Sequence, residues 1–198
     1  MNQELPGQRL MKDEAFIASI MEKGEQAKQK ARIAFTVLSA TQLNWKPWVH
    51  DWSIAQCLDH LVISDSSYFP VLKKITEGTY YMNAWTKYSP ISTLWGRLLK
   101  DRLREQVKKK MTAPRIFQPT ASEMSIDSIE RYFSNLDSFL AYISKCRTID
   151  LDKTIIPSPV TQIITYSLRD ALSFLVQHEH RHLNQAIKVQ THENFPIK

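Results

Sequence analysis

Three of the six histidines of the chain lie within five consecutive residues near the C-terminus, in the segment His178-Glu179-His180-Arg181-His182. His178 and His182 are four residues apart, so on a helix their side chains project from the same side, one turn apart. Two imidazoles placed in this way can bind a single metal ion. His180 is two residues from each of them and points to the opposite side. We therefore expect His180 and Arg181 to lie at the surface, or to contact the metal ligands without binding the ion themselves.

His60 is the candidate for a third ligand, although it lies far upstream in the sequence. On a helix it belongs to a row of small or polar side chains, which are Ser53, Cys57, His60, Ser64 and Ser67. Such a row indicates either a cavity at a helix interface or a helix edge that faces solvent. Three neutral imidazoles on one divalent ion would leave coordination positions open, as catalytic metal sites do.

Acidic side chains accompany both histidine segments. Glu179 is the nearest candidate for a general base, but it points about 100° away from His178 around the helix, so we expect it to be solvated. Asp59 and Asp65 are candidates to orient His60 through its other ring nitrogen, with exposed surface charge as the alternative. No catalytic residue is assigned from the sequence.

Cys57 precedes His60 by three residues and therefore lies on nearly the same helical face. One interpretation is a soft fourth ligand or a reactive thiol. We favour a small buried side chain that packs against Trp52, the residue before the helix cap.

The composition favours a helical globular protein. The 198 residues include only 4 glycines. The phosphate-binding motifs G-x-x-x-x-G-K and G-x-G-x-x-G are both missing from the sequence. The two cysteines form neither a disulfide framework nor a zinc-finger pattern. The N-terminus lacks the pattern of a signal peptide, and no apolar run approaches the roughly 18 residues of a membrane span. We therefore expect a soluble, cytoplasmic protein with no membrane association.

The net charge is +6, and much of the excess lies at residues 100–110, within a short basic helix that we expect at about residues 91–110. A solvated helix face is the favoured interpretation of this segment. Binding of nucleic acid through the basic helix is the alternative, although no nucleic-acid recognition motif accompanies the charge.

Apolar periodicity and capping residues predict an all-α fold, a four-helix bundle with long crossovers. The long helices are expected at residues 10–39, 53–76, from about residue 125 onward, and 167–190. The second begins with the capping box Ser53-x-x-Gln56, and Pro70 predicts a kink or break within it. The fourth begins with a similar pattern, Ser167-x-x-Asp170, after an extended connection that contains prolines.

We expect a single domain over residues 1–198, with an insertion around residues 78–120. The insertion holds the basic helix and two loops, at residues 78–90 and 112–119. The first loop is rich in aromatic residues, and these either form one wall of a substrate pocket or serve packing and a dimer contact. They are Tyr80, Tyr81, Trp85 and Tyr88.

Two segments resemble the signatures of the DinB-like superfamily of four-helix-bundle proteins, named for DNA-damage inducibility. The first is Trp52-Ser53-Ile54-Ala55-Gln56-Cys57-Leu58-Asp59-His60-Leu61, and the second is His178-x-x-x-His182 followed by Gln185. The resemblance implies that His60, His178 and His182 form a triad of metal ligands. It also implies a divalent ion, with zinc or nickel as the first choices and iron or manganese as alternatives. Family members often have histidine where this chain has Arg181, so that position departs from the pattern.

The superfamily includes bacillithiol- and mycothiol-dependent transferases. The resemblance therefore implies a metal-dependent S-transferase or hydrolase that acts on a small-molecule substrate, with a low-molecular-weight thiol as a candidate partner and a homodimer as the expected assembly. A non-catalytic metal-binding protein of the stress response is the alternative within the family.

Overall fold

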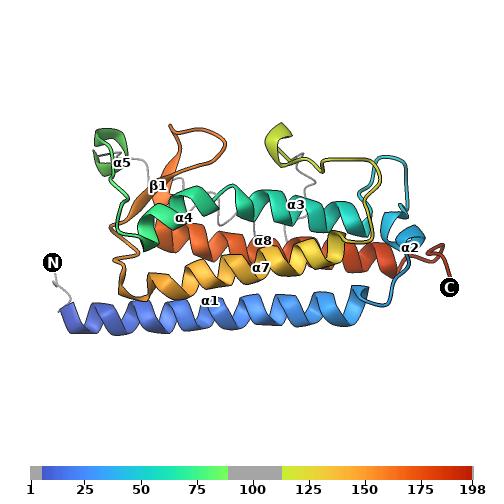
Figure 1. Cartoon of the computed structure of the whole chain (residues 1–198), viewed down its shortest axis with the longest axis horizontal. Coiled ribbons are helices and arrows are strands. Elements are labelled where there is room, and N and C mark those ends of the chain that lie inside the picture. The colour runs from blue at the N-terminus through green and yellow to red at the C-terminus, as the bar shows by residue number, and fades with distance from the viewer. Residues whose placement is uncertain (1–5, 89–112, 198) are drawn as a thin grey trace.

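The computed structural model describes residues 6–88 and 113–197. Within these residues, four long helical segments run alongside one another (Figure 1): α1 (Pro6–Phe35), α3 (Ile54–Ser66) continued by α4 (Phe69–Thr76), α7 (Ser128–Ser144) and α8 (Leu168–Gln190). Helices α1 and α3 each pack against both α7 and α8, so they lie diagonally opposite each other. This arrangement confirms the predicted all-α four-helix bundle.

The direction of the helices requires a long crossover, as predicted. Helices α1 and α8 run one way along the bundle, whereas α3 and α7 run the other way (Figure 1). The chain therefore returns from the end of α4 to the opposite end of the bundle before α7 begins. Part of this crossover, including the predicted basic helix, lies outside the described residues. The single domain and its insertion remain predictions.

Helix α3 begins where its capping box predicts. The Gln56 backbone N–H donates to Ser53 Oγ (3.2 Å), and the Ser53 backbone N–H donates to Gln56 Oε1 (3.2 Å). The break predicted by Pro70 also occurs, because α3 ends at Ser66 and α4 starts at Phe69 with the proline in its first turn. The helix register that carries His60 is thus set at its start.

Several short elements complete the described chain and were not predicted. Helix α2 (Ala40–Asn44) has its own capping box, and α5 (Ala84–Tyr88) forms within the expected aromatic loop. The 3-10 helices η1 (Arg115–Phe117) and η2 (Lys145–Thr148) lie in the second loop and after α7.

A small antiparallel hairpin forms in the predicted extended connection before α8. Strands β1 (Ile155–Pro157) and β2 (Thr165–Ser167) pair with Ile156 opposite Tyr166. The Ser158 backbone N–H donates to the Ile164 carbonyl oxygen (2.8 Å) beyond the paired residues. The second strand leads directly into α8, whose N-cap is Ser167 as predicted.

The apolar core lies between the four long helices, and one glycine permits their close approach. A Cβ atom at Gly24 of α1 would lie 2.4 Å from Leu140 Cδ2 of α7. A larger residue at this position would force the two helices apart or displace the leucine. Among the described residues, no helix has the length and apolar character needed to cross a membrane.

The two capping boxes offer a matched test of how burial affects a cap. Ser53 is fully buried, whereas Ser39, which caps α2 in the same way, is exposed. We predict that Ser53→Ala lowers the free energy of unfolding by about 1–2 kcal/mol, because no water can replace the lost acceptor. Ser39→Ala should cost distinctly less in the same urea titration. Equal losses would contradict the role of burial.

Candidate metal centre

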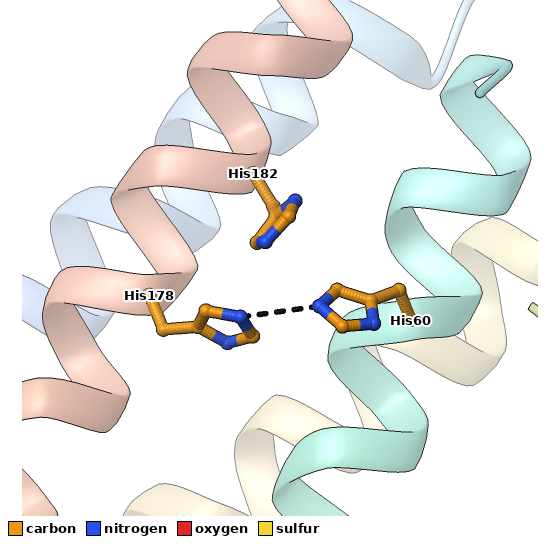
Figure 2. Close-up of side chains that lie close together, drawn as sticks. All are labelled: His60, His178 and His182. Atoms are coloured by element: carbon orange, nitrogen blue, oxygen red, sulfur yellow. Dashed lines mark hydrogen bonds between the residues drawn. The ribbon is translucent and has the colours of Figure 1, made fainter. Parts of the chain in front are cut away.

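The structure brings His60 of α3 together with His178 and His182 of α8 (Figure 2). The Nε2 atoms of His60 and His178 are 3.1 Å apart, and the His182 ring centroid lies 4.4 Å and 4.5 Å from those of His60 and His178. Nitrogens that bind one ion at about 2.0–2.1 Å would themselves be about 3 Å apart. The three rings are therefore close to the geometry of a shared ion.

The hydrogen bond of His60 fixes which of its nitrogens faces the other histidines. Its Nδ1 lies 2.5 Å from the carbonyl oxygen of Phe117. A carbonyl can only accept, so Nδ1 carries the proton and donates it. The lone pair then resides on Nε2, which is the atom directed at His178. A backbone partner of this kind commonly orients a metal-binding histidine.

His182 contributes a buried nitrogen that lacks a partner. Its Nδ1 finds no hydrogen-bond acceptor or donor within the described part of the chain, although the residue is only 6% exposed. A buried imidazole nitrogen without a partner is costly. The Trp52 ring stacks on His182 (centroids 5.9 Å apart) and also contacts His60 (4.9 Å). The indole thus covers one side of the histidine group.

Burial keeps all three imidazoles neutral. It lowers the pKa of His60, and it lowers the pKa values of His178 and His182 well below their ordinary range. The positive charge of Arg181 acts in the same direction on each ring, and the neighbouring histidines add to the effect on His178 and His182. Neutral imidazole is the form that binds a metal ion, so the group is already in its binding state near neutral pH.

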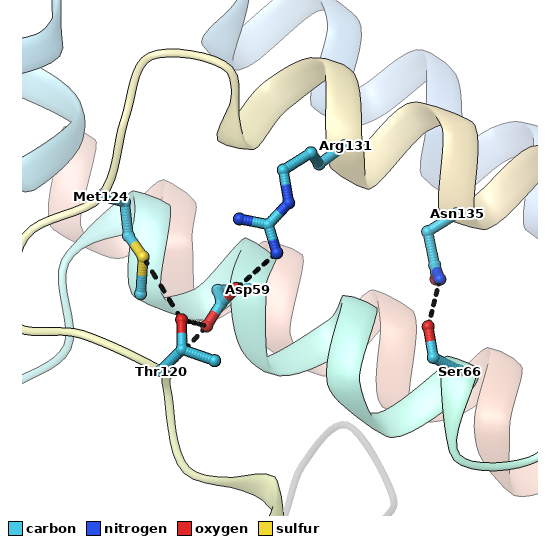
Figure 3. Close-up of polar contacts among 6 residues, drawn as sticks. All are labelled: Asp59, Ser66, Thr120, Met124, Arg131 and Asn135. Atoms are coloured by element: carbon cyan, nitrogen blue, oxygen red, sulfur yellow. Dashed lines mark hydrogen bonds and ion pairs between the residues drawn. The ribbon is translucent and has the colours of Figure 1, made fainter.

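Asp59 holds Thr120 (Figure 3), three residues after the Phe117 whose carbonyl contacts His60. Its Oδ2 accepts from the Thr120 backbone N–H (2.8 Å) and hydroxyl (2.9 Å), while Oδ1 pairs with Arg131 of α7 (3.3 Å). Both interpretations of Asp59 from the sequence were wrong, because it is buried yet does not bond to the ring of His60. The carboxylate acts on His60 indirectly, by placing the segment that contains Phe117 and Thr120.

The expectation that Glu179 is solvated was also wrong, because this residue is fully buried. Its position about 100° from His178 faces α7, where Tyr132 donates its hydroxyl to Oε2 (2.7 Å). Burial raises the pKa of Glu179 to about 7, and burial beside Glu179 raises the pKa of Asp65 well above its usual range. Asp65 is thus neither a surface charge nor the partner of the His60 ring.

The remaining sequence candidates lie away from the histidine group. Cys57 is fully buried and is not among the described side chains that converge on a metal position, which supports the packing interpretation. His180 is turned away as predicted, with Nε2 3.0 Å from the carbonyl oxygen of Lys23 in α1. Arg181 is partly buried and lines the cavity described next.

A cavity of about 1180 Å³ opens beside the three histidines and is lined by α3, α8 and the segments around Trp52 and Phe117. Two members of the row of small or polar side chains, His60 and Ser64, line it, whereas Ser53 and Cys57 are fully buried. This part of the row is therefore not a solvent-facing helix edge. The aromatic residues near α5 do not form its described wall. Tyr80 and Trp85 instead donate hydrogen bonds to carbonyl oxygens of the β1–β2 region.

Comparison with known proteins gives matching results. The family model of the DinB superfamily matches residues 24–186. An uncharacterized protein of Bacillus subtilis (strain 168), YuaE, is 28% identical over 154 residues, which cover 77% of this chain and 86% of that protein. No solved structure matches the chain significantly.

The environment of the two cysteines predicts their reactivity. Burial raises the pKa of the Cys146 thiol to about 11 and also raises that of Cys57. A raised pKa keeps a thiol protonated to higher pH, so we predict that neither cysteine reacts with a disulfide reagent in the native protein at about pH 8. Both should react after unfolding in denaturant. Rapid labelling of native Cys57, followed by mass spectrometry of the peptide, would instead support a reactive thiol.

Proposed function

The chain belongs to the DinB superfamily, and we propose that it is a metal-dependent enzyme in which His60, His178 and His182 bind one divalent ion. The observation that carries this proposal is the convergence of three neutral imidazoles beside a cavity. Three protein ligands leave positions on the ion for other molecules, as catalytic sites require. The lone pair of His60 Nε2, which the Phe117 carbonyl orients toward His178, fits an imidazole-bound ion.

The donor set narrows the choice of metal. Imidazole nitrogens suit zinc, nickel and iron, whereas manganese favours sites richer in carboxylate oxygen. No carboxylate is among the described side chains that converge with the histidines. We therefore propose zinc or nickel, with iron or manganese as the alternatives.

The proposed reaction is transfer of a thiol to an electrophile or, as the second choice, hydrolysis. A divalent ion bound by the histidines would lower the pKa of a thiol or water that also binds it. The protein itself supplies a cavity large enough for a small-molecule substrate and an aromatic cover, Trp52, over the imidazoles. A low-molecular-weight thiol, a homodimer and a role in stress are further proposals that rest on the family resemblance. A cytoplasmic location is a proposal that rests on the sequence composition.

A non-catalytic metal-binding protein is the second candidate, and one observation favours it. The buried carboxyl groups of Asp59, Asp65 and Glu179 are absent from the described lining of the cavity. None of these three buried carboxyl groups is therefore placed to act as a base on a substrate there, and Asp51 is the carboxylate found in the described lining. Thiol-transfer assays on the metal-loaded protein separate the two candidates, since turnover lost in His182→Ala would exclude the non-catalytic one. Nucleic-acid binding rests on a segment outside the described residues and remains a prediction.

Metal titration of the purified full chain tests the proposed ligands. After chelation and dialysis, the wild type should bind one zinc or nickel ion per chain. His60→Ala and His182→Ala should each weaken binding by roughly 100-fold or more, because each removes a ligand whose orientation the fold maintains. His180→Ala is the matched control from the same helix and should bind as the wild type does. Wild-type affinity in His60→Ala and His182→Ala, or no binding by the wild type, would refute the assignment.

A further inference from the structure

One end of the cavity is lined by hydroxyl groups that the proposed metal chemistry does not use. Ser64 follows His60 by one turn on α3, and Tyr68 lies between the end of α3 and the start of α4. Ser158 and Tyr166 come from the β1–β2 hairpin. All four line the same cavity as the histidines, with side chains only 4%, 5%, 9% and 0% exposed, in the order named. We call these four residues the hydroxyl cluster.

The two tyrosines are held in place and joined to each other. The hydroxyl groups of Tyr68 and Tyr166 are 2.5 Å apart. Phe174 of α8 packs edge-on against both rings, with centroids 6.3 Å from Tyr68 and 5.0 Å from Tyr166. Because Phe174 precedes His178 by about one helical turn, the cluster lies on the side of the histidines that faces the start of α8.

A count of protons shows that the cluster has a donor to spare. Ser158 also hydrogen-bonds with Tyr166, and its Oγ accepts from the Val160 backbone N–H (3.2 Å). Each contact between two hydroxyl groups uses one O–H proton, so two contacts among three hydroxyls leave one proton unused. No further acceptor for that proton is found among the described residues, and buried donors are rarely left without one.

Ser64 provides an independent sign of a missing partner. Its Oγ is buried and makes no hydrogen bond within the described chain. It lies between His60 and Tyr68 in the chain, about 6 Å from His60 along the axis of α3. A molecule that extends from the histidines toward the tyrosines would pass this hydroxyl.

The cluster also differs in charge from the other end of the cavity. The cationic lining residues of α8 are Arg181 and Lys188, and both follow His178 in the helix. No cationic side chain is found among the described lining residues beside the cluster, and the buried carboxyl of Asp65 is close enough to influence Tyr68. This end therefore suits an uncharged polar group better than an anion.

We propose that the hydroxyl cluster is a substrate subsite that binds an uncharged oxygen atom, such as a hydroxyl, carbonyl or ether oxygen, on the part of the substrate remote from the metal. The inference rests on the proposed function, because the histidine-bound ion fixes the other end of the substrate. It adds a recognition element that the metal ligands do not supply. Ser64, Tyr68, Ser158 and Tyr166 then act in binding and specificity rather than in the chemical step.

Thiols of increasing length provide the probe. Cobalt(II)-loaded full-length protein would be titrated with mercaptoalkanols and with alkanethiols of the same chain length, and thiol binding would be followed by the visible absorption of the cobalt. At the chain length that reaches the cluster, the hydroxyl should improve binding relative to methyl. We expect this advantage to fall by roughly three- to tenfold in Tyr166→Phe and in Ser64→Ala, the size of one neutral hydrogen bond.

Tyr80→Phe is the matched control, because it removes a phenol that hydrogen-bonds the Ile155 carbonyl and does not line the cavity. It should leave the advantage unchanged, and all variants should retain cobalt and bind alkanethiols as the wild type does. Equal affinities for the two thiol series at every length would overturn the subsite alone. So would an equal loss for both series in Tyr166→Phe. Failure of the wild type to bind cobalt would instead remove the proposed function, and the subsite with it.

Discussion

The burial of three imidazole rings against one another is the constraint around which this structure is organised. Each ring has two nitrogens that need partners, yet His60, His178 and His182 are nearly excluded from water. One contact between rings, one backbone carbonyl and the side chain of Gln185 meet part of that need, and Nδ1 of His182 is left without a partner in the described chain. A shared divalent ion would meet the remainder. It would also explain why three polar imidazoles occupy the bundle core, where apolar side chains could be buried at a lower free-energy cost.

The surrounding elements can be understood as the means of holding these rings in place. The Ser53 capping box sets the start of α3 and hence the register of His60. Asp59 fastens the loop whose Phe117 carbonyl determines the tautomer of His60, and the same carboxylate reaches α7 through Arg131. The β1–β2 hairpin leads into α8 and places Tyr166 in the cavity wall. Metal position, tautomer and cavity shape therefore depend on contacts made by different segments of the chain.

Features encoded by neighbouring residues could be predicted, whereas those made by distant residues could not. The helix starts at Ser53 and Ser167, the break at Pro70 and the shared face of His178 and His182 follow from spacings of a few residues. The addition of His60 needed the family resemblance as well as periodicity. The Phe117 carbonyl and the Tyr68–Tyr166 contact join residues 57 and 98 positions apart, so they depend on helix packing. Glu179 was misjudged for the same reason, because the sequence does not reveal that its side chain is buried in the bundle, where Tyr132 of α7 donates to it.

The three-histidine centre is defined by the atoms that bind the ion, and X-ray absorption spectroscopy of the zinc-loaded protein identifies these atoms directly. We predict a first shell of nitrogen and oxygen at about 2.0–2.1 Å, with outer-shell scattering from three imidazoles and none from sulfur. Loss of one imidazole in His60→Ala should be visible in the same spectrum. A sulfur ligand at about 2.3 Å would contradict the three-histidine centre. So would a spectrum of His60→Ala that is identical to that of the wild type.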